Sequence, residues 1–461
     1  MLENNSLKRD GFSSKLGILA TTAGSAIGLG NIWKFPYITG TYGGSAFIIV
    51  YLLCILLIGL PIMLSEFILG RSSQKNCVGA FKKLAPKTPW FMGGWLSILT
   101  TFIIAGFYGI IAGWSLNYIF FSLVGKLNVS KTVDFESVFS QFISNPWQPV
   151  LAQIIIMALA GFILISGIKN GIEKYSRILM PLLLIIIILI VIRSLTLDGA
   201  EKGLDFLLKP DFSKLNLAAI ISALGHAFFS LSLGMGVIMT YGSYIGKENN
   251  LMKTTLQVTI TDTLIALLAG LAIFPAVFAF NIEPTSGPGL VFITLPNVFS
   301  NMPLGNIFEI LFFILLTIAA LTSLISVLEV IVSFLHEELK WSRKKSTLIT
   351  IISTTTFGAI LSQGNGVLSN FNIPFIVEGK SVNMNIFDWF ITLSDQLLPL
   401  GGLIVAVFIG WILKDKVTKN ECSSNGLYKT PYYSVFKFLI KYITPLLIIF
   451  IFLSNIFGLF K

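Results

Sequence analysis

Residues 21–36 read TTAGSAIGLGNIWKFP and lie inside an apolar run that is long enough to cross a bilayer. Three glycines (Gly24, Gly28 and Gly30) and one asparagine (Asn31) fall in the middle of this run. Glycine costs about 1 kcal/mol relative to alanine in a helix interior, and unpaired backbone groups in hydrocarbon are costlier still. A membrane segment keeps such residues where irregular backbone lines a buried site. The stretch therefore predicts a membrane helix that is interrupted at mid-depth.

The composition indicates a chain that lies mostly in lipid. Of its 461 residues, 54% are hydrophobic and only 12% are charged, and the mean hydropathy is +0.84. Soluble domains carry about 25% charged residues. The net charge of +10 is concentrated in particular loops without interleaved stacking aromatic residues, which argues against nucleic-acid binding. The three cysteines (Cys54, Cys77 and Cys422) suggest neither a disulfide framework nor a metal site.

Apolar stretches of about 20 residues mark the expected membrane spans. We place eleven, at residues 15–38, 44–69, 91–124, 149–168, 176–196, 217–244, 256–281, 307–336, 346–363, 388–413 and 436–459. Segment 287–300 is too short to span and is interpreted as a re-entrant or capping hairpin. The short polar start lacks a signal-peptide cleavage pattern, so we expect the first span to be retained.

The loop charges predict the orientation. The loops after spans two, four, eight and ten are basic, whereas the alternate loops are nearly neutral. Cytoplasmic loops carry the excess of lysine and arginine. We therefore expect a multi-pass protein of the cell membrane (inner or plasma), surrounded by lipid, with a cytoplasmic amino terminus and its carboxyl terminus outside.

The sixth span contains a similar interruption, FFSLSLGMG at residues 228–236. Spans one and six are five helices apart, and an odd offset places the two halves in opposite orientations. A broken helix frees N–H groups that can hold a carboxylate and C=O groups that can hold a cation, so an amino acid and sodium are the natural ligands. Close helix packing at both glycine pairs is the alternative explanation.

The predicted fold is thus an all-α membrane protein with an inverted five-plus-five helix repeat, discontinuous helices 1 and 6, and an eleventh helix. We divide it into a cytoplasmic gate segment (1–14), a first repeat (15–200), a second repeat (201–414), and a loop with the eleventh helix (415–461).

Several motifs, in order along the predicted spans, resemble those of the neurotransmitter:sodium symporters. The motifs are GSAIGLGN at 24–31 with FPY at 35–37, GGSAF at 43–47, GLP at 59–61 with Glu66 and Gly70-Arg71, GIEK at 171–174 with Met180-Pro181, GMG at 234–236, LTS at 321–323, and YITP at 442–445. The resemblance runs from about residue 9 to the end. It is closest to the bacterial eleven-helix branch, which takes up hydrophobic and aromatic amino acids with Na⁺.

The resemblance implies two sodium sites and one substrate site. The first sodium would bind Ala26, Asn31, Ser230 and Asp262, and the second Gly24, Ile27, Ala319, Thr322 and Ser323. The substrate would contact Ala26, Leu29, Gly30, Ile104, Tyr108, Phe229, Ser230, Ser232, Met235, Ser323 and Val327. Each has a purely structural alternative: helix hydroxyls bond to carbonyls one turn earlier, tyrosines anchor at interfaces, and apolar residues fill cores.

Ionisable residues at membrane depth are candidates for function. Asp262 stands where many animal relatives have a neutral residue and need chloride, so we hypothesise that its carboxylate makes transport chloride-independent and can carry a returning proton. His226 shares a hydrogen bond with Tyr51 and Asp262, titrates together with Asp262, or is a neutral core imidazole. Glu66 is expected to brace the broken helices through their free N–H groups.

The gates follow from the same resemblance. Arg9 and Glu337 match the family's cytoplasmic ion pair, with Tyr244 nearby, although both charges could simply face solvent. Outside, Lys34 replaces the usual arginine, and we predict that it pairs with Asp388.

The sequence and the resemblance thus predict a monomeric or weakly dimeric Na⁺ symporter that imports hydrophobic or aromatic L-amino acids by alternating access. A membrane-embedded enzyme that uses Asp262, Glu66 and His226 is the rival class. With only two histidines and no Cys/His cluster, the chain has few groups for the paired catalysis or metal binding that such an enzyme needs. A channel is a third possibility.

Overall fold

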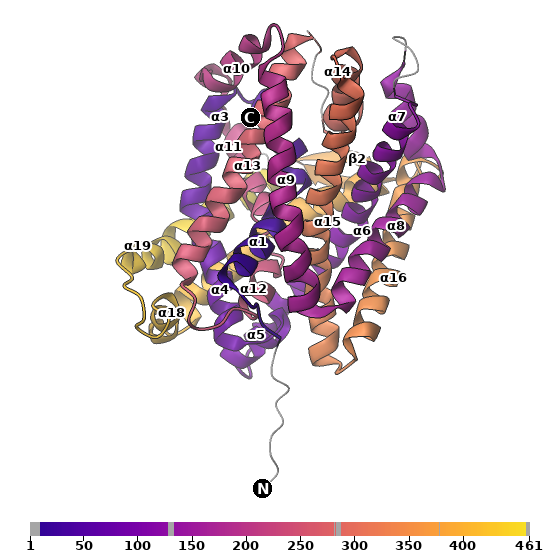
Figure 1. The fold of residues 1–461 in the computed structure, drawn as a ribbon. Coiled ribbons are helices and arrows are strands. Elements are labelled where there is room, and N and C mark those ends of the chain that lie inside the picture. The colour runs from indigo at the N-terminus through magenta and orange to yellow at the C-terminus, as the bar shows by residue number, and fades with distance from the viewer. Residues whose placement is uncertain (1–9, 128–132, 281, 283–286, 378, 458–461) are drawn as a thin grey trace.

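A computed structural model describes residues 10–127, 133–280, 282, 287–377 and 379–457. It is a bundle of long helices that run between two ends of the molecule, with short helices gathered at each end (Figure 1). The first half contains α1 (Lys15–Ala26), α2 (Phe35–Thr41), α3 (Ser45–Cys54), α4 (Leu60–Ser73), α5 (Cys77–Leu84), α6 (Phe91–Leu123), α7 (Phe135–Ser144), α8 (Gln148–Ile165), α9 (Lys174–Leu195) and α10 (Ala200–Leu208).

The second half contains α11 (Leu217–Ser230), α12 (Val237–Gly242), α13 (Leu251–Ala279), α14 (Leu295–Asn301), α15 (Gly305–Glu338), α16 (Arg343–Ser362), α17 (Ile386–Val407), α18 (Asp415–Cys422), α19 (Tyr433–Phe438) and α20 (Thr444–Phe457). Short π-helical turns continue into α2, α4, α9, α14 and α20 and extend α17. Strands β1 (Asn372–Val377) and β2 (Lys380–Asn385) form an antiparallel hairpin in which Asn372 pairs with Asn385.

Within the described residues, eight helices are long and apolar enough to cross a membrane, and a bent pair in the first span makes up to nine. The two other expected spans, 217–244 and 346–363, correspond to α11 with α12 and to α16. The segment expected to be too short to span forms the short apolar helix Leu290–Asn301. The prediction of an all-helical membrane fold is confirmed.

The first span is broken where the glycines predict it. Helix α1 ends at Ala26, Ile27 is extended (φ −73°, ψ 101°), and helical structure resumes at Gly30. The two arms, Lys15–Ala26 and Gly30–Thr41, are bent by 53°.

The sixth span is also broken. Helix α11 ends at Ser230 and α12 begins at Val237. Between them Ser232, Gly234 and Gly236 have φ values of 54°, 79° and 78°. Two of these three positions are glycines because glycine adopts positive φ without a steric penalty.

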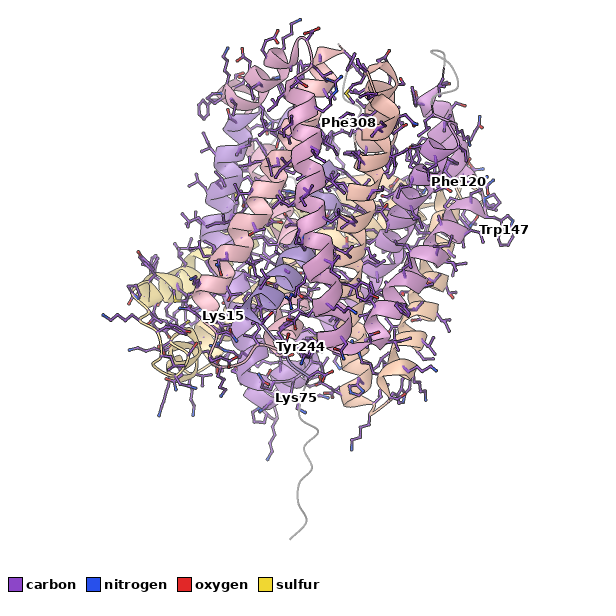
Figure 2. The ribbon with its side chains drawn as sticks, viewed as in Figure 1. Lys15, Lys75, Phe120, Trp147, Tyr244 and Phe308 are labelled. Atoms are coloured by element: carbon purple, nitrogen blue, oxygen red, sulfur yellow. The ribbon has the colours of Figure 1, made fainter. Side chains whose placement is uncertain are left out.

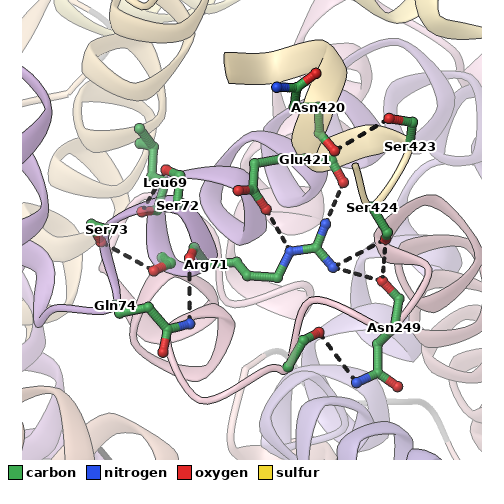
Figure 3. A network of polar contacts seen from close by, with 12 residues as sticks. Leu69, Arg71, Ser72, Ser73, Gln74, Asn249, Asn420, Glu421, Ser423 and Ser424 are labelled. Carbon is green, nitrogen blue, oxygen red and sulfur yellow. Dashed lines mark hydrogen bonds and ion pairs between the residues drawn. The ribbon is translucent and has the colours of Figure 1, made fainter. Parts of the chain in front are cut away.

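A buried arginine fixes the short helix α18 to the bundle (Figure 3). The side chain of Arg71, at the end of α4, is fully buried, and its Nε donates to Glu421 Oε2 of α18 at 2.6 Å. Its Nη1 donates to the Asn249 carbonyl just before α13 at 2.6 Å, and its Nη2 to the Glu421 carbonyl. Three segments that are far apart in sequence therefore meet at one guanidinium.

Candidate functional site

The two helix breaks lie against each other in the middle of the bundle. The Ser232 hydroxyl donates to the Ser25 carbonyl at 2.8 Å, and the Asn31 amide donates to Ser230 Oγ at 3.2 Å. Both interruptions thus contribute groups to one buried place, as expected for discontinuous helices that form a binding site.

A cavity separates the breaks from α6 and α15. All the residues expected to contact substrate line it except Leu29, and Ser25 and Gly28 are two further lining residues. The complete lining is Ser25, Ala26, Gly28, Gly30, Ile104, Tyr108, Phe229, Ser230, Ser232, Met235, Ser323 and Val327. Leu29 lies just beside it, where its backbone N–H donates to the Tyr108 hydroxyl at 3.1 Å. The cavity has a polar wall at the breaks and an apolar wall of Ile104, Phe229 and Val327.

Glycine is required at the break because the opposite wall is very close. A Cβ atom on Gly28 would lie 2.6 Å from both Tyr108 Oη and Ser323 Oγ. A Cβ atom on Gly30 would lie 3.0 Å from the Phe229 ring. The sequence signature signals a break, but only the structure shows that Gly28 and Ser25 line the cavity.

The residues expected at the first sodium site are in direct contact around a buried carboxylate. The Asn31 amide donates to Asp262 Oδ1 at 2.7 Å, and the Ser230 hydroxyl donates to Asp262 Oδ2 at 2.9 Å. Asp262 is fully buried, and Ala26 lies in the adjoining cavity wall. This cluster offers a negative charge and hard oxygen atoms, which suit an alkali cation.

The residues expected at the second sodium site also come together. The Ser323 hydroxyl of α15 lies within hydrogen-bond distance of the carbonyls of Gly24 (3.3 Å) and Ile27 (3.2 Å) at the end of α1. The Thr322 hydroxyl lies 3.1 Å from the Ala319 carbonyl, the usual bond of a helix hydroxyl. Ser323 therefore joins α15 to the interrupted end of α1, and Thr322 lies beside Gly24. Carbonyl and hydroxyl oxygen atoms at a broken helix suit an alkali cation.

His226 and Tyr51 do not form the expected hydrogen bond with Asp262. Their rings pack 5.3 Å apart, and within the described residues the imidazole nitrogens have no hydrogen-bond partner. His226 is surrounded by Tyr51 and Phe35, whose ring lies 5.7 Å away. The position is therefore an aromatic core contact, the last of the three interpretations of His226.

Glu66 braces the second break, as expected. Its carboxylate is fully buried and accepts from the backbone N–H groups of Gly234 at 2.7 Å and Met239 at 3.3 Å. These donors lie at the start of α12 and just before it, where the broken helix leaves N–H groups unpaired.

The predicted pairing of Lys34 with Asp388 is wrong. Lys34 Nζ lies 3.1 Å from Asp395 Oδ1 of α17. Asp388 instead lies in the first turn of α17, where it pairs with the capping residue Asn385. The two carboxylates are two helical turns apart, roughly 10 Å along the axis, and the deeper one is at the level of Lys34.

A second cavity, of about 350 Å³, adjoins the first on the side of Lys34 and Asp395. Gly30, Tyr108 and Phe229 line both cavities, so these residues form the partition between them. Lys34 Nζ also lies 5.0 Å from the centroid of the Phe229 ring. The ion pair and the aromatic partition therefore belong to one barrier.

The opposite side is closed by a network of which the sequence analysis identified only Tyr244. Arg343 of α16 makes a two-point contact with Glu329 of α15 (3.1 and 2.6 Å), and the Tyr244 hydroxyl donates to Glu329 at 2.8 Å. The N–H of Phe12, before α1, donates to the Tyr244 carbonyl at 3.2 Å. Glu329 is fully buried, and a buried carboxylate in an apolar span was the available signal.

Of the expected cytoplasmic ion pair, Arg9 and Glu337, the structure describes only Glu337. Arg9 lies outside the described residues. Glu337 accepts from the backbone N–H and the side-chain amide of Asn76, both at 3.0 Å. The segment before α1 is held by Glu173, which accepts from the Ser13 N–H at 2.7 Å and from the Ser14 hydroxyl at 2.9 Å.

The fold and the site define a class of protein: a secondary transporter with a central binding site between two broken helices, a vestibule on one side and a closed network on the other. Comparison with known proteins identifies the family. The model of the sodium:neurotransmitter symporter family matches residues 9–140 and 129–460, and the chain belongs to this family. It is a sodium-dependent symporter and not an enzyme.

Relatives from distant microorganisms share nearly the whole chain. It is 40% identical over 446 residues to the uncharacterized sodium-dependent transporter YhdH of Bacillus subtilis, covering 96% of this chain and 97% of the relative. It is 38% identical over 468 residues to an uncharacterized sodium-dependent transporter of Haemophilus influenzae, covering 99% and 100%. The crystal structure of MhsT in complex with L-phenylalanine superposes with a TM-score of 0.88 at 42% identity, covering 97% of this chain and 100% of that one.

Proposed function

We propose that the protein imports hydrophobic, chiefly aromatic, L-amino acids together with Na⁺ by alternating access. The observation that carries the proposal is the cavity between the two breaks, whose polar wall suits a zwitterion and whose apolar wall includes Phe229 and Ile104. Met235, which has no ring, lines this cavity. Gly234 and Gly236 pack instead against α17 and against Ser97 and Cys77, so the cavity of about 20 Å³ must widen to admit a large side chain. The similar transporter MhsT was solved in complex with L-phenylalanine, which supports the same substrate class.

The ligand groups have distinct proposed roles. The substrate carboxylate binds near the Leu29 and Gly30 amides and the Tyr108 hydroxyl, and the amino group faces the ends of α1 and α11. One sodium ion binds at Asn31, Ser230 and Asp262, and a second at Gly24, Ile27, Ala319, Thr322 and Ser323. Each sodium site has hard oxygen ligands, and the first lies next to the substrate, so that Na⁺ and the amino acid stabilise each other's binding.

Asp262 supplies a fixed negative charge, and transport is therefore independent of chloride. Supporting this proposal, the carboxylate is buried beside the proposed first sodium site, and Ala266, one turn later on α13, offers no hydroxyl. On the empty return step the same carboxylate can carry a proton outward, because a buried charge without its cation is costly.

The proposed orientation places the amino terminus in the cytoplasm and the carboxyl terminus outside. Helices α5 and α18 and the start of α16, which carry the basic loops, lie at one end of the bundle (Figure 1). The vestibule at Lys34 and Asp395 then opens to the outside, and the network of Tyr244, Glu329 and Arg343 closes the inside. The division into two inverted repeats and a final helix is part of this proposal.

Uptake into liposomes tests the proposal. Purified protein is reconstituted, a Na⁺ gradient is applied, and uptake of labelled phenylalanine is measured with each of the twenty amino acids as competitor. We expect competition by large hydrophobic and aromatic residues and none by charged ones. Replacing Na⁺ with choline should abolish uptake, whereas replacing Cl⁻ with gluconate should leave it unchanged.

Matched variants assign the ion sites. Asp262→Asn should reduce uptake by at least tenfold, whereas Asp198→Asn, the same change at an exposed carboxylate, should have no effect. Uptake that persists without a Na⁺ gradient would contradict the proposed coupling. A sharp fall in gluconate would contradict only the chloride independence.

A further inference from the structure

A separate cavity of about 350 Å³ lies at the basic end of the molecule, outside the proposed transport site. It is formed by the start of α1, the first turns of α13 and the loop after α18. Its lining residues are Lys15, Leu16, Ile18, Leu19, Asn249, Asn250, Lys253, Thr254, Gln257 and Tyr428. Lys15 lies beside the lower end of α13, at the level of the short helices at that end (Figure 2).

The two lysines of this cavity carry charges that no carboxylate of the described residues neutralises. Lys15 and Lys253 are exposed, and within the described residues no ion pair joins either of them to a carboxylate. The carboxylate nearest in sequence to Lys253, Glu248, accepts from the Asn249 amide at 2.8 Å. Asn250, Thr254 and Gln257 add polar side chains. The cavity therefore presents two free positive charges and hydrogen-bonding groups, which suit a phosphate group.

The polar cavity stands at the head of an apolar ridge on α13. Leu256, Ile260 and Leu264 are 49%, 49% and 54% exposed, and they follow Lys253 at spacings of three and four residues. Residues at this spacing share one face of a helix. Leu16 of α1, at the cavity itself, is 61% exposed. A cationic cavity that continues into an exposed apolar ridge matches a molecule with an anionic head and an acyl chain.

We propose that this cavity binds the phosphate of an anionic phospholipid, with the headgroup between Lys15 and Lys253 and an acyl chain along Leu256, Ile260 and Leu264. A free phosphate ion shares the headgroup chemistry, but it would leave the ridge unused. Basic pockets between membrane helices at the cytoplasmic side are known sites for anionic headgroups. The assignment to the inner leaflet rests on the proposed orientation, whereas lipid binding itself does not depend on transport.

The proposed lipid would join two parts of the proposed mechanism. Helix α1 reaches from this cavity to the break at Ala26, and α13 carries Asp262. A headgroup that bridges Lys15 and Lys253 would hold the N-terminal end of α1 against α13.

Native mass spectrometry of the delipidated full-length protein tests the proposal. The protein is titrated with dioleoyl-phosphatidylglycerol or with dioleoyl-phosphatidylcholine, which differ in headgroup charge. We expect one phosphatidylglycerol to bind at least tenfold more tightly than phosphatidylcholine. Lys15→Gln/Lys253→Gln should weaken phosphatidylglycerol binding at least fivefold. Lys340→Gln/Lys344→Gln removes the same charge from exposed positions at the α15–α16 connection and should leave it unchanged.

Two further experiments distinguish a phospholipid headgroup from a free phosphate ion. Leu256→Ser/Ile260→Ser should weaken phosphatidylglycerol binding if the acyl chain occupies the ridge, and millimolar inorganic phosphate should fail to displace the lipid. Displacement by phosphate, together with no effect of the serine variants, would overturn the lipid assignment. Equal binding by the wild type and Lys15→Gln/Lys253→Gln would overturn the site. If the double variant does not elute as a folded protein, each single variant should show at least a threefold loss, and unchanged binding in both would overturn the site equally.

Discussion

Gly28 shows how one residue without a side chain shapes the candidate site. A Cβ atom at this position would meet Tyr108 Oη and Ser323 Oγ at 2.6 Å. Overpacking of this kind costs about 1–3 kcal/mol. Because the added methyl group would enter the cavity, we expect the cost to fall on the ligand-bound state, where 1.4 kcal/mol corresponds to about a tenfold loss of affinity. We therefore expect Gly28→Ala to weaken Na⁺-dependent phenylalanine binding about tenfold or more, as measured by thermal stabilisation. Gly225→Ala is the control, because a Cβ atom there has nothing within 4 Å; equal losses in both variants would contradict this steric argument.

Asp395 is the carboxylate that holds Lys34 at the vestibule. The Lys34–Asp395 pair is part-exposed, so it contributes at most about 1 kcal/mol to stability. The pair matters for transport because it holds Lys34 over Phe229, at the partition between the vestibule and the central cavity. We expect Asp395→Asn to reduce uptake several-fold with little change in melting temperature, and Asp388→Asn to leave uptake unchanged. Initial uptake rates of both variants in liposomes test this prediction. A loss of uptake in Asp388→Asn but not in Asp395→Asn would support the pairing of Lys34 with Asp388 instead.

At the residue scale the sequence motifs located most of the cavity, because glycines together with Asn31 in the middle of an apolar span favour an interrupted helix over a packed one. The motifs could not choose between Asp388 and Asp395, which lie on one helix two turns apart. That choice depends on how deep α17 sits against Lys34, a tertiary distance. Glu329 is an acid in an apolar span, which is a signal in the sequence, but nothing local marks Arg343, one of several basic residues in its loop, as its partner.

A single guanidinium joins helix α18 to α4 and to the segment before α13. Arg71 reaches the Glu421 side chain and carbonyl and the Asn249 carbonyl from a fully buried position (Figure 3). Lysine keeps the charge but lacks the planar fork, so Arg71→Lys leaves buried acceptors unpaired, at about 1–3 kcal/mol. We expect a melting temperature lower by several degrees. Arg193→Lys, at the surface of α9, should melt like the wild type, and a normal melting temperature for Arg71→Lys would show that α18 is held by other contacts.

At the scale of elements, apolar length and glycine position predicted the helices and both breaks. The sequence did not predict the π-helical turns, the β1–β2 hairpin or the docking of α18. These features depend on long-range partners such as Arg71 with Glu421, which are 350 residues apart. Local propensity carries no information on such contacts, because the stabilising groups meet only after the bundle has formed.

At the scale of the whole molecule, the two sides of the central cavity differ. One side has a vestibule of about 350 Å³ behind the partition of Tyr108 and Phe229. The other is sealed by contacts that run from Phe12 through Tyr244 and Glu329 to Arg343. Arg343 also donates to the Leu164 carbonyl at 2.7 Å, so it ties α8, α15 and α16 to the segment before α1. Opening the sealed side requires this network to separate.

Arg343 is therefore expected to set how often the sealed side opens. Arg343→Gln leaves the buried carboxylate of Glu329 without its cation, which costs about 3 kcal/mol or more and favours a state in which water reaches it. We expect faster hydrogen–deuterium exchange in peptides from residues 11–24 and 237–244, and slower Na⁺-driven uptake, because a seal that opens without substrate uncouples the gradient. Lys344→Gln removes the neighbouring exposed charge and should change neither quantity. If exchange rises only in α16, the contact stabilises that helix alone and the seal does not depend on it.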